Sequence, residues 1–254
     1  MNTVWLRNVE IGSGVPKVIV PIVAQTRAEI LSDGRRLKGL ECDLVEWRVD
    51  FCRDAMDTEK VLDILAGLRR ELEEKPILFT FRTKREGGQR EISPEDYAQL
   101  NIAAARSGHA DGVDVEVFSQ GERAAELIRG IHDAGSAVVG SNHEFGYTPS
   151  QQEMVTRLCS MQELGCDILK IAVMPRSRRD VLALLSATEE MYTNHARQPV
   201  VTMSMGGLGA VSRLCGGAFG SAMTFGAAGQ TSAPGQVQVE QLNTALRIIH
   251  SAME

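Results

Sequence analysis

The sequence predicts a (β/α)8 barrel with a short N-terminal β-hairpin, in a single domain that spans residues 1–254. Eight short runs rich in β-branched residues alternate with longer segments whose apolar positions recur every three or four residues. The chain has 254 residues, 43% of them hydrophobic, which is enough for one sizeable core. This length and this alternation favour a closed barrel over an open doubly wound sheet.

The elements follow in order along the chain. The segment "TVWLRNVEIGSG" predicts a hairpin that lies under the barrel as a plug. Helical periodicity is clear at 58–74 and at 148–165, where Thr148 before Pro149 is a start signal and Gly165 a stop signal. The expected strands occupy residues 17–23, 43–49, 77–83, 112–118, 137–143, 167–173, 199–205 and 219–225.

Alternation along each strand separates the side chains that face the helices from those that face the barrel axis. In "DLVEWRVD", Val45, Trp47 and Val49 form the apolar set, which must face the helices. The other set points to the axis and is joined by polar residues of later strands: Glu46, Arg48, Asp50, Thr80, Arg82, Asp114, Glu116, Ser141, His143 and Lys170. Charges of both signs therefore converge near the carboxyl ends of the strands, where barrels of this kind have their active sites.

Lys170 stands alone in the apolar run "DILKIAV". Lysine is almost never fully buried without a partner or a purpose. Burial and nearby cations such as Arg48 and Arg82 should favour its neutral amine, which can attack a ketone or aldehyde and form a Schiff base. We therefore interpret Lys170 as a nucleophile.

His143 ends the strand that precedes the strand of Lys170. Histidine titrates near neutral pH, so this position suits a general acid or base. The other histidines, at positions 109, 132, 195 and 250, fall in or beside helical segments and are interpreted as structural.

Composition argues against several other classes of protein. The net charge of −6 comes from 33 acidic and 27 basic residues without a basic block, which argues against nucleic acid as a partner. The sequence has neither a basic leader followed by an apolar stretch nor an apolar run long enough to span a membrane, so we expect a cytoplasmic protein. The five cysteines lack CxxC spacing, so we expect them to be reduced thiols. The histidines lack metal-ligand spacing, and "MGGLGAVSRLCGGAFGS" matches no nucleotide-binding glycine motif, so we expect no metal and no cofactor.

Six motifs occur in order: "EWRVD", "FTFRTKREGG", "SNHEF", "KIAVMP", "MSMGGLGAVSR" and "FGAAGQTSAPGQ". Together they resemble those of type I 3-dehydroquinate dehydratases over essentially the whole chain. The resemblance implies a (β/α)8 barrel, usually a homodimer, that converts 3-dehydroquinate to 3-dehydroshikimate in the shikimate pathway without metal or cofactor.

The resemblance also implies residue roles. It places the Schiff-base lysine at Lys170, the general acid/base at His143, and the acid that positions this histidine at Glu86. The remaining implied contacts are Glu46, Arg48 and Arg82 to the substrate hydroxyls, Arg213 to its carboxylate, and Ser232 and Gln236 from a loop. Two departures stand out: Pro21 replaces a serine of some members, and "GGLG" at 206–209 replaces a more polar stretch.

Two alternatives remain open at this point. A Schiff-base aldolase would share Lys170 but cleave a carbon–carbon bond, and a non-catalytic barrel would only bind a polyhydroxy acid. The segment 229–236, with a glycine near each end and no large apolar residue, is further expected to be a lid over bound substrate.

Overall fold

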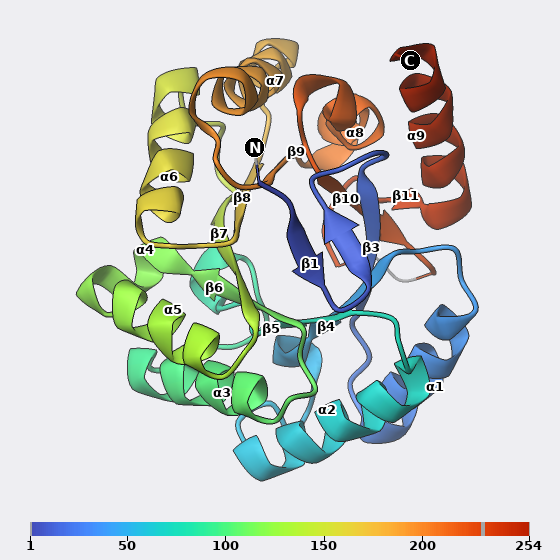
Figure 1. The fold of residues 1–254 in the computed structure, drawn as a ribbon, viewed down its shortest axis with the longest axis vertical. Helices are drawn as coiled ribbons and strands as arrows, with labels where there is room; N and C mark the ends of the chain where they lie inside the picture. Colours follow the sequence, from blue (N-terminus) through green and yellow to red (C-terminus); the bar gives the residue numbers. More distant parts are fainter. Residues whose placement is uncertain (1, 230–231, 254) are drawn as a thin grey trace.

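The computed structural model describes residues 2–229 and 232–253, and its centre is a barrel of eight parallel strands (Figure 1). From β3 to β9 each strand pairs with the next along the chain, and β3 also pairs with β10. Between β9 and the segment before β10 the pairing is an isolated bridge, Val200 to Ser221. The barrel closes where the Ala222 amide donates to the Val200 carbonyl at 2.7 Å. The strands are β3 (Lys17–Ile22), β4 (Leu44–Arg48), β5 (Ile77–Thr80), β6 (Gly112–Glu116), β7 (Ala137–Glu144), β8 (Ile168–Val173), β9 (Val200–Ser204) and β10 (Met223–Ala227).

Eight longer helices surround this barrel, so the predicted fold class is confirmed (Figure 1). They are α1 (Arg27–Lys38), α2 (Thr58–Leu72), α3 (Pro94–Arg106), α5 (Ala124–Asp133), α6 (Gln151–Glu163), α7 (Arg178–Glu190), α8 (Gly206–Cys215) and α9 (Val239–Met253). A short helix α4 (Val117–Gln120) follows β6, and a short strand β11 (Val237–Gln238) pairs with the end of β10.

Several predicted boundaries were wrong. The strands expected at 77–83 and 112–118 end at Thr80 and Glu116, and the second is followed directly by helix α4. The last barrel strand begins at Met223 and not at residue 219, because residues 216–219 form a short 3-10 helix that ends at Gly220 with φ of 98°. Helix α6 begins after Ser150, whose side chain accepts from the Glu153 amide, so serine is the cap and not Thr148.

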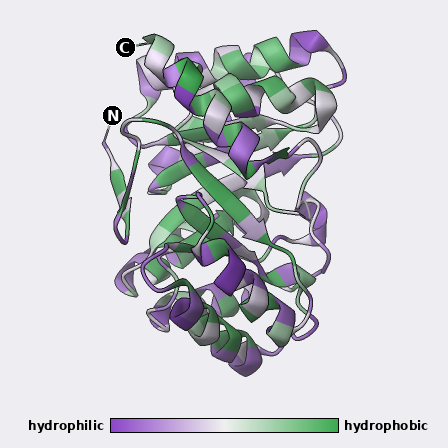
Figure 2. Ribbon diagram, turned by 90° about the vertical axis from the view of Figure 1, so that its right-hand side faces the viewer, coloured by the Kyte–Doolittle hydropathy of each residue, from purple (hydrophilic) through white to green (hydrophobic). Residues whose placement is uncertain are grey.

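The strand faces separate as alternation requires. Trp47 points to the helices and meets Phe79 edge to face at 5.8 Å between ring centroids. A second apolar cluster fills the barrel axis. The hairpin of β1 (Val4–Leu6) and β2 (Val9–Ile11) inserts Leu6 and Ile11 into this axial cluster, so the predicted plug is confirmed. Seen from the side, the hairpin lies at one end of the barrel (Figure 2). Within residues 2–229 and 232–253, no helix combines the length and apolarity needed to cross a bilayer.

Candidate active site

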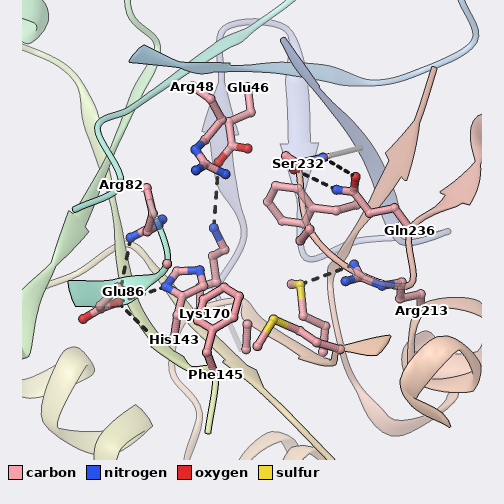
Figure 3. A pocket seen from close by; sticks show the side chains of 16 residues that line it. Glu46, Arg48, Arg82, Glu86, His143, Phe145, Lys170, Arg213, Ser232 and Gln236 are labelled. Atoms are coloured by element: carbon pink, nitrogen blue, oxygen red, sulfur yellow. Dashed lines mark hydrogen bonds and ion pairs between the residues drawn. The ribbon is translucent and has the colours of Figure 1, made fainter. Parts of the chain in front are cut away.

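A cavity opens at the carboxyl ends of the strands, at the end of the barrel opposite the hairpin. Figure 3 shows the side chains that line it. Its empty space, counting the open mouth, is about 470 Å³, which is the size of a small-molecule site. All nine residues nominated from the sequence line it: Glu46, Arg48, Arg82, Glu86, His143, Lys170, Arg213, Ser232 and Gln236. The remaining lining residues are Gly87, Phe145, Ala172, Met203, Met205, Phe225 and Ala233.

Lys170 lies in the middle of β8, and its side chain is almost fully buried. Its Nζ donates to Asp114 Oδ2 at 3.0 Å, lies 3.9 Å from Glu46 Oε1, and stands 4.6 Å from the centroid of the Phe225 ring. The expectation of mainly cationic neighbours was therefore wrong, because two carboxylates and an aromatic face are the groups nearest to the amine. These contacts fix the position of Nζ beside the cavity.

Asp114, on β6, ties the amine to a buried charge network. Its Oδ1 accepts from Arg82 Nη2 at 2.7 Å and from Ser141 Oγ at 2.6 Å. Burial opposes ionisation of this carboxyl, but Arg82 and Lys170 outweigh it and lower the pKa of Asp114 to about 2. The residue is thus a fixed negative charge beside Lys170. Alternation along the strand placed Asp114 on the axial face, but no role was assigned to it. The sequence offered one indication of a role, which is that Lys170 is predicted to lie on the same face.

Arg82 is shared between carboxylates. Besides Asp114, its Nη1 donates to Glu116 Oε1 and to Ser141 Oγ, each at 3.0 Å. Burial alone would lower the pKa of Arg82, but Asp114, Glu116 and Glu86 raise it well above its usual value. Arg82 therefore reaches the cavity as a permanent cation held in place by the protein itself.

His143 and Glu86 form a buried pair. The His143 Nδ1 atom lies 2.9 Å from Glu86 Oε2, and the same oxygen accepts from the His143 backbone amide at 3.0 Å. Ser119 Oγ donates to the other Glu86 oxygen at 3.3 Å. Among the described residues, no hydrogen-bond partner occupies Nε2, so this nitrogen is free to act on a ligand.

The environment of the pair disfavours charge on both members. Burial, followed by the negative charge of Glu116, raises the pKa of Glu86 to about 8. Burial, followed by the cations Arg82, Lys170 and Arg48, lowers the pKa of His143 well below its usual value. Near neutral pH the imidazole is uncharged, which is the form that a general base requires.

The loop after β5 holds Glu86 in place. Its 3-10 turn (Lys84–Glu86) ends at Gly87, where φ is 84° and a Cβ atom would lie 2.2 Å from the Phe145 ring. The Gln89 amide donates to Asp50 Oδ2 at 3.0 Å, which anchors the far side of the loop. Glycine is required at 87 for both its backbone angle and its closeness to Phe145.

Two residues nominated for substrate hydroxyls lie on β4. Arg48 donates to Asp50 through Nε at 2.8 Å and Nη2 at 2.9 Å, a bidentate pair that holds the guanidinium beside the cavity. Glu46 accepts from Thr80 Oγ1 at 3.0 Å. Both side chains are buried and oriented before any ligand arrives, which favours rigid binding.

Arg213, on α8, is buried without a carboxylate partner among the described residues. Its Nη1 contacts Met203 Sδ at 3.6 Å, its Nη2 donates to the Pro234 carbonyl at 3.3 Å, and its Nε has no partner. Burial lowers the pKa of Arg213 to about 10, so the guanidinium stays charged. An uncompensated buried cation that lines a cavity is suited to bind an anion.

The loop after β10 brings Ser232 and Gln236 to the cavity (Figure 3). They bond to one another: Gln236 Nε2 donates to Ser232 Oγ at 3.0 Å, and the Ser232 amide donates to Gln236 Oε1 at 2.9 Å. The predicted lid, 229–236, includes residues 230 and 231, which lie outside the described residues. Its closure stays a prediction.

Among residues 2–229 and 232–253, no group of three or more His, Cys, Asp or Glu is placed to bind a metal ion. Pro21 does not line the cavity and contributes to a separate surface groove. The apolar walls were missed from the sequence because Met203, Met205 and Phe225 have the same pattern as ordinary core residues.

A buried cation without a partner lowers the stability of the folded protein. Such groups are found mainly at functional sites, where they bind a ligand or take part in a reaction. Such a cation, Arg213, here shares a cavity with an amine and an acid/base pair. The cavity also lies at the barrel end where enzymes of this architecture act. The fold and the site therefore define a barrel enzyme for a small anionic molecule.

Comparison with known proteins specifies the family. A family model described as type I 3-dehydroquinase matches residues 18–253. The 3-dehydroquinate dehydratase of Syntrophotalea carbinolica is 49% identical over 250 residues, covering 98% of this chain and 99% of that protein. A crystal structure of the type I enzyme of Clostridium difficile, with covalently modified comenic acid, has a TM-score of 0.96 at 44% identity and covers 99% of each chain. The chain belongs to the type I 3-dehydroquinase family.

Proposed function

We propose that the protein dehydrates 3-dehydroquinate to 3-dehydroshikimate through an imine at Lys170, with His143 as general acid and base. One observation carries the proposal: a buried amine, a neutral histidine and an unpaired guanidinium line one cavity. Family membership favours this lyase over the aldolase and over the non-catalytic binding protein. The homodimer, the cytoplasmic location and the place in the shikimate pathway remain predictions from the resemblance.

The ketone is activated first. Lys170 gives up its ammonium proton and attacks the carbonyl carbon as the free amine, which forms a carbinolamine. A proton then adds to the carbinolamine hydroxyl, which leaves as water, and a protonated imine remains. His143 Nε2 then removes the proton from the adjacent carbon, and the electron pair moves toward the iminium nitrogen to form an enamine. A ketone alone would hold this proton too tightly for a histidine base.

The enamine electrons then expel the β-hydroxyl group, which leaves as water with the proton from His143. This step forms the carbon–carbon double bond and restores the iminium. Water hydrolyses the iminium, which releases the product and frees Lys170. The net change is the loss of one water molecule, as a hydro-lyase requires.

The surrounding residues stabilise and orient these species. Asp114, held ionised by Arg82, provides a fixed counter-charge 3.0 Å from the nitrogen that becomes the iminium. Arg213 binds the substrate carboxylate, and Glu46, Arg48 and Arg82 contact its hydroxyls. Ser232 and Gln236 complete the pocket from the loop. Correct orientation of the leaving group relative to His143 follows from this binding.

Borohydride reduction tests the imine. In the presence of 3-dehydroquinate, reduction should attach substrate-derived mass to the peptide that contains Lys170, detected by mass mapping. Reduction without substrate is the control and should leave this peptide unchanged. Label on another lysine, or no label on an active enzyme, would contradict the proposed mechanism.

The activity should depend on the ionisation of Glu86. We expect kcat/KM to rise with pH and to level off above about 8, the pKa of Glu86 in the free enzyme. Loss of this proton lets Glu86 accept from Nδ1 of His143, which leaves the lone pair of Nε2 toward the substrate. In the Glu86→Gln variant the amide oxygen can still accept from Nδ1 but cannot ionise, so this limb should disappear. An unchanged limb in Glu86→Gln would assign it to another group.

The same ionisation has the opposite effect on stability. The folded chain binds the Glu86 proton more tightly than the unfolded chain, because the pKa rises from 4.5 to about 8. The stabilising contribution of this group is thus complete below pH 4.5 and is lost as pH rises through about 8. Activity and stability should therefore change in opposite directions over this interval.

A further inference from the structure

The guanidinium of Arg213 contacts a thioether sulfur, and no carboxylate of the described chain binds it. Met203 lies on β9 and belongs to the axial cluster, and its Sδ lies 3.6 Å from Arg213 Nη1. Both side chains are buried and both line the cavity. A thioether sulfur is a weak hydrogen-bond acceptor, so it covers the cation without neutralising it. Arg213 stays available for an anion for this reason.

We propose that Met203 is an oxidative modification site whose sulfoxide closes the anion site at Arg213. The oxidant is a peroxide: its O–O bond breaks, one oxygen bonds to Sδ, and the peroxide is reduced to water or an alcohol. Sulfur is oxidised by two electrons, and the product carries a strong polar acceptor in place of a weak one. This oxygen accepts hydrogen bonds from the Arg213 N–H groups and repels a carboxylate.

Placement distinguishes Met203 from the other methionines of the described chain. Met154, Met161 and Met191 are fully buried in the core between the barrel and its helices. Met56 and Met253 are exposed to oxidant, but they do not line the cavity, and neither do Met174 and Met223. Met205 lines the cavity but makes no described hydrogen bond to the guanidinium. Met203 combines access through the cavity with contact to the cation that binds the anion.

The inference rests on the proposed function in one respect, that Arg213 binds the substrate carboxylate. Treatment with hydrogen peroxide should add one oxygen to the peptide that contains Met203 and raise KM about tenfold or more, with a smaller effect on kcat. This is the range expected when a hydrogen bond to a charged group is lost. Methionine sulfoxide reductase should restore KM, and bound 3-dehydroquinate should slow the oxidation.

Two leucine variants provide matched controls. Each variant is compared with its own untreated enzyme. Met203→Leu should keep its own KM after peroxide, whereas Met205→Leu should respond as the wild type does. Loss of the response in Met205→Leu alone would overturn the assignment. An unchanged KM in wild-type enzyme that carries oxygen on Met203 would overturn the proposal directly, even if neither variant folds.

Borohydride labelling separates this inference from the mechanism. If untreated enzyme with 3-dehydroquinate gives no label on Lys170, the proposed mechanism fails. If untreated enzyme is labelled and oxidised enzyme needs the same substrate concentration for half-maximal labelling, the mechanism stands and the role of Met203 is refuted. A higher half-maximal concentration after oxidation supports both.

Discussion

Replacement of Lys170 by methionine will abolish turnover while the barrel remains folded. The variant keeps an apolar stem of similar length but has no amine, so no imine can form. Removal of the nucleophile from a covalent enzyme can cost on the order of 10⁶-fold in kcat, and we expect a loss of this size. The measurement is the appearance of 3-dehydroshikimate at saturating 3-dehydroquinate.

The folding of this variant can be judged from the contacts of Asp114. Breaking a buried ion pair usually costs about 3–5 kcal/mol, because one charge is left without a partner. Asp114 keeps its bonds to Arg82 and Ser141, so the loss of stability should be smaller. Thermal unfolding should therefore stay cooperative. Lys38→Ala, at an exposed ion pair with Glu73 on the barrel surface, is the control and should retain full activity. Substantial turnover by folded Lys170→Met would refute the imine mechanism.

Much of the site was predictable because alternation along a strand is a strict geometric rule. Once Trp47 was assigned to the helices, Glu46 and Arg48 had to face the axis, and the structure places them there. Parallel strands in a barrel end at one face, which is why His143 and Lys170 line one cavity although they lie on different strands. Residues outside the strands, such as Glu86 in the turn after β5 and Arg213 on α8, came from the family resemblance and not from periodicity.

The sequence could not show how charges are paired inside the barrel. Arg82 was expected to act on Lys170 as a neighbouring cation, but it is bound by Asp114 and Glu116, and Asp114 also binds Lys170. Pairing depends on the stagger between strands, which is set by the closed barrel and not by any one segment. The thioethers of Met203 and Met205 on the axis were indistinguishable from ordinary core residues, because their sequence pattern is the same.

The pairing has a consequence for catalysis. The charged groups of the cavity are held by the protein in advance: Arg48 by Asp50, and Arg82 by Asp114 and Glu116. Arg213 differs, because no carboxylate of the described chain binds it. Preorganised dipoles and charges stabilise developing charge without reorganisation during the reaction. In the proposed mechanism the substrate carboxylate provides the negative group that Arg213 lacks in the described chain.

Replacement of His143 by alanine should separate imine formation from proton transfer. Lys170 and its contacts to Asp114 and Phe225 remain, so the imine should still form and borohydride should still label the lysine. Turnover should fall by about two to four powers of ten, the usual contribution of a general acid or base. Single-turnover labelling and steady-state kcat, measured on the same preparation, provide the two readings.

The fold should tolerate this change because of the state of Glu86. Its pKa of about 8 means that the carboxyl is mainly protonated near neutral pH, so removal of the imidazole leaves no bare buried charge. His195→Ala, at a half-exposed histidine after α7, is the matched control and should keep normal turnover. Near-normal turnover in His143→Ala would remove this residue from the chemistry. Loss of both label and turnover in a folded variant would instead mean that His143 is already needed to form the imine, because the attack of the amine and the loss of water from the carbinolamine also require proton transfers.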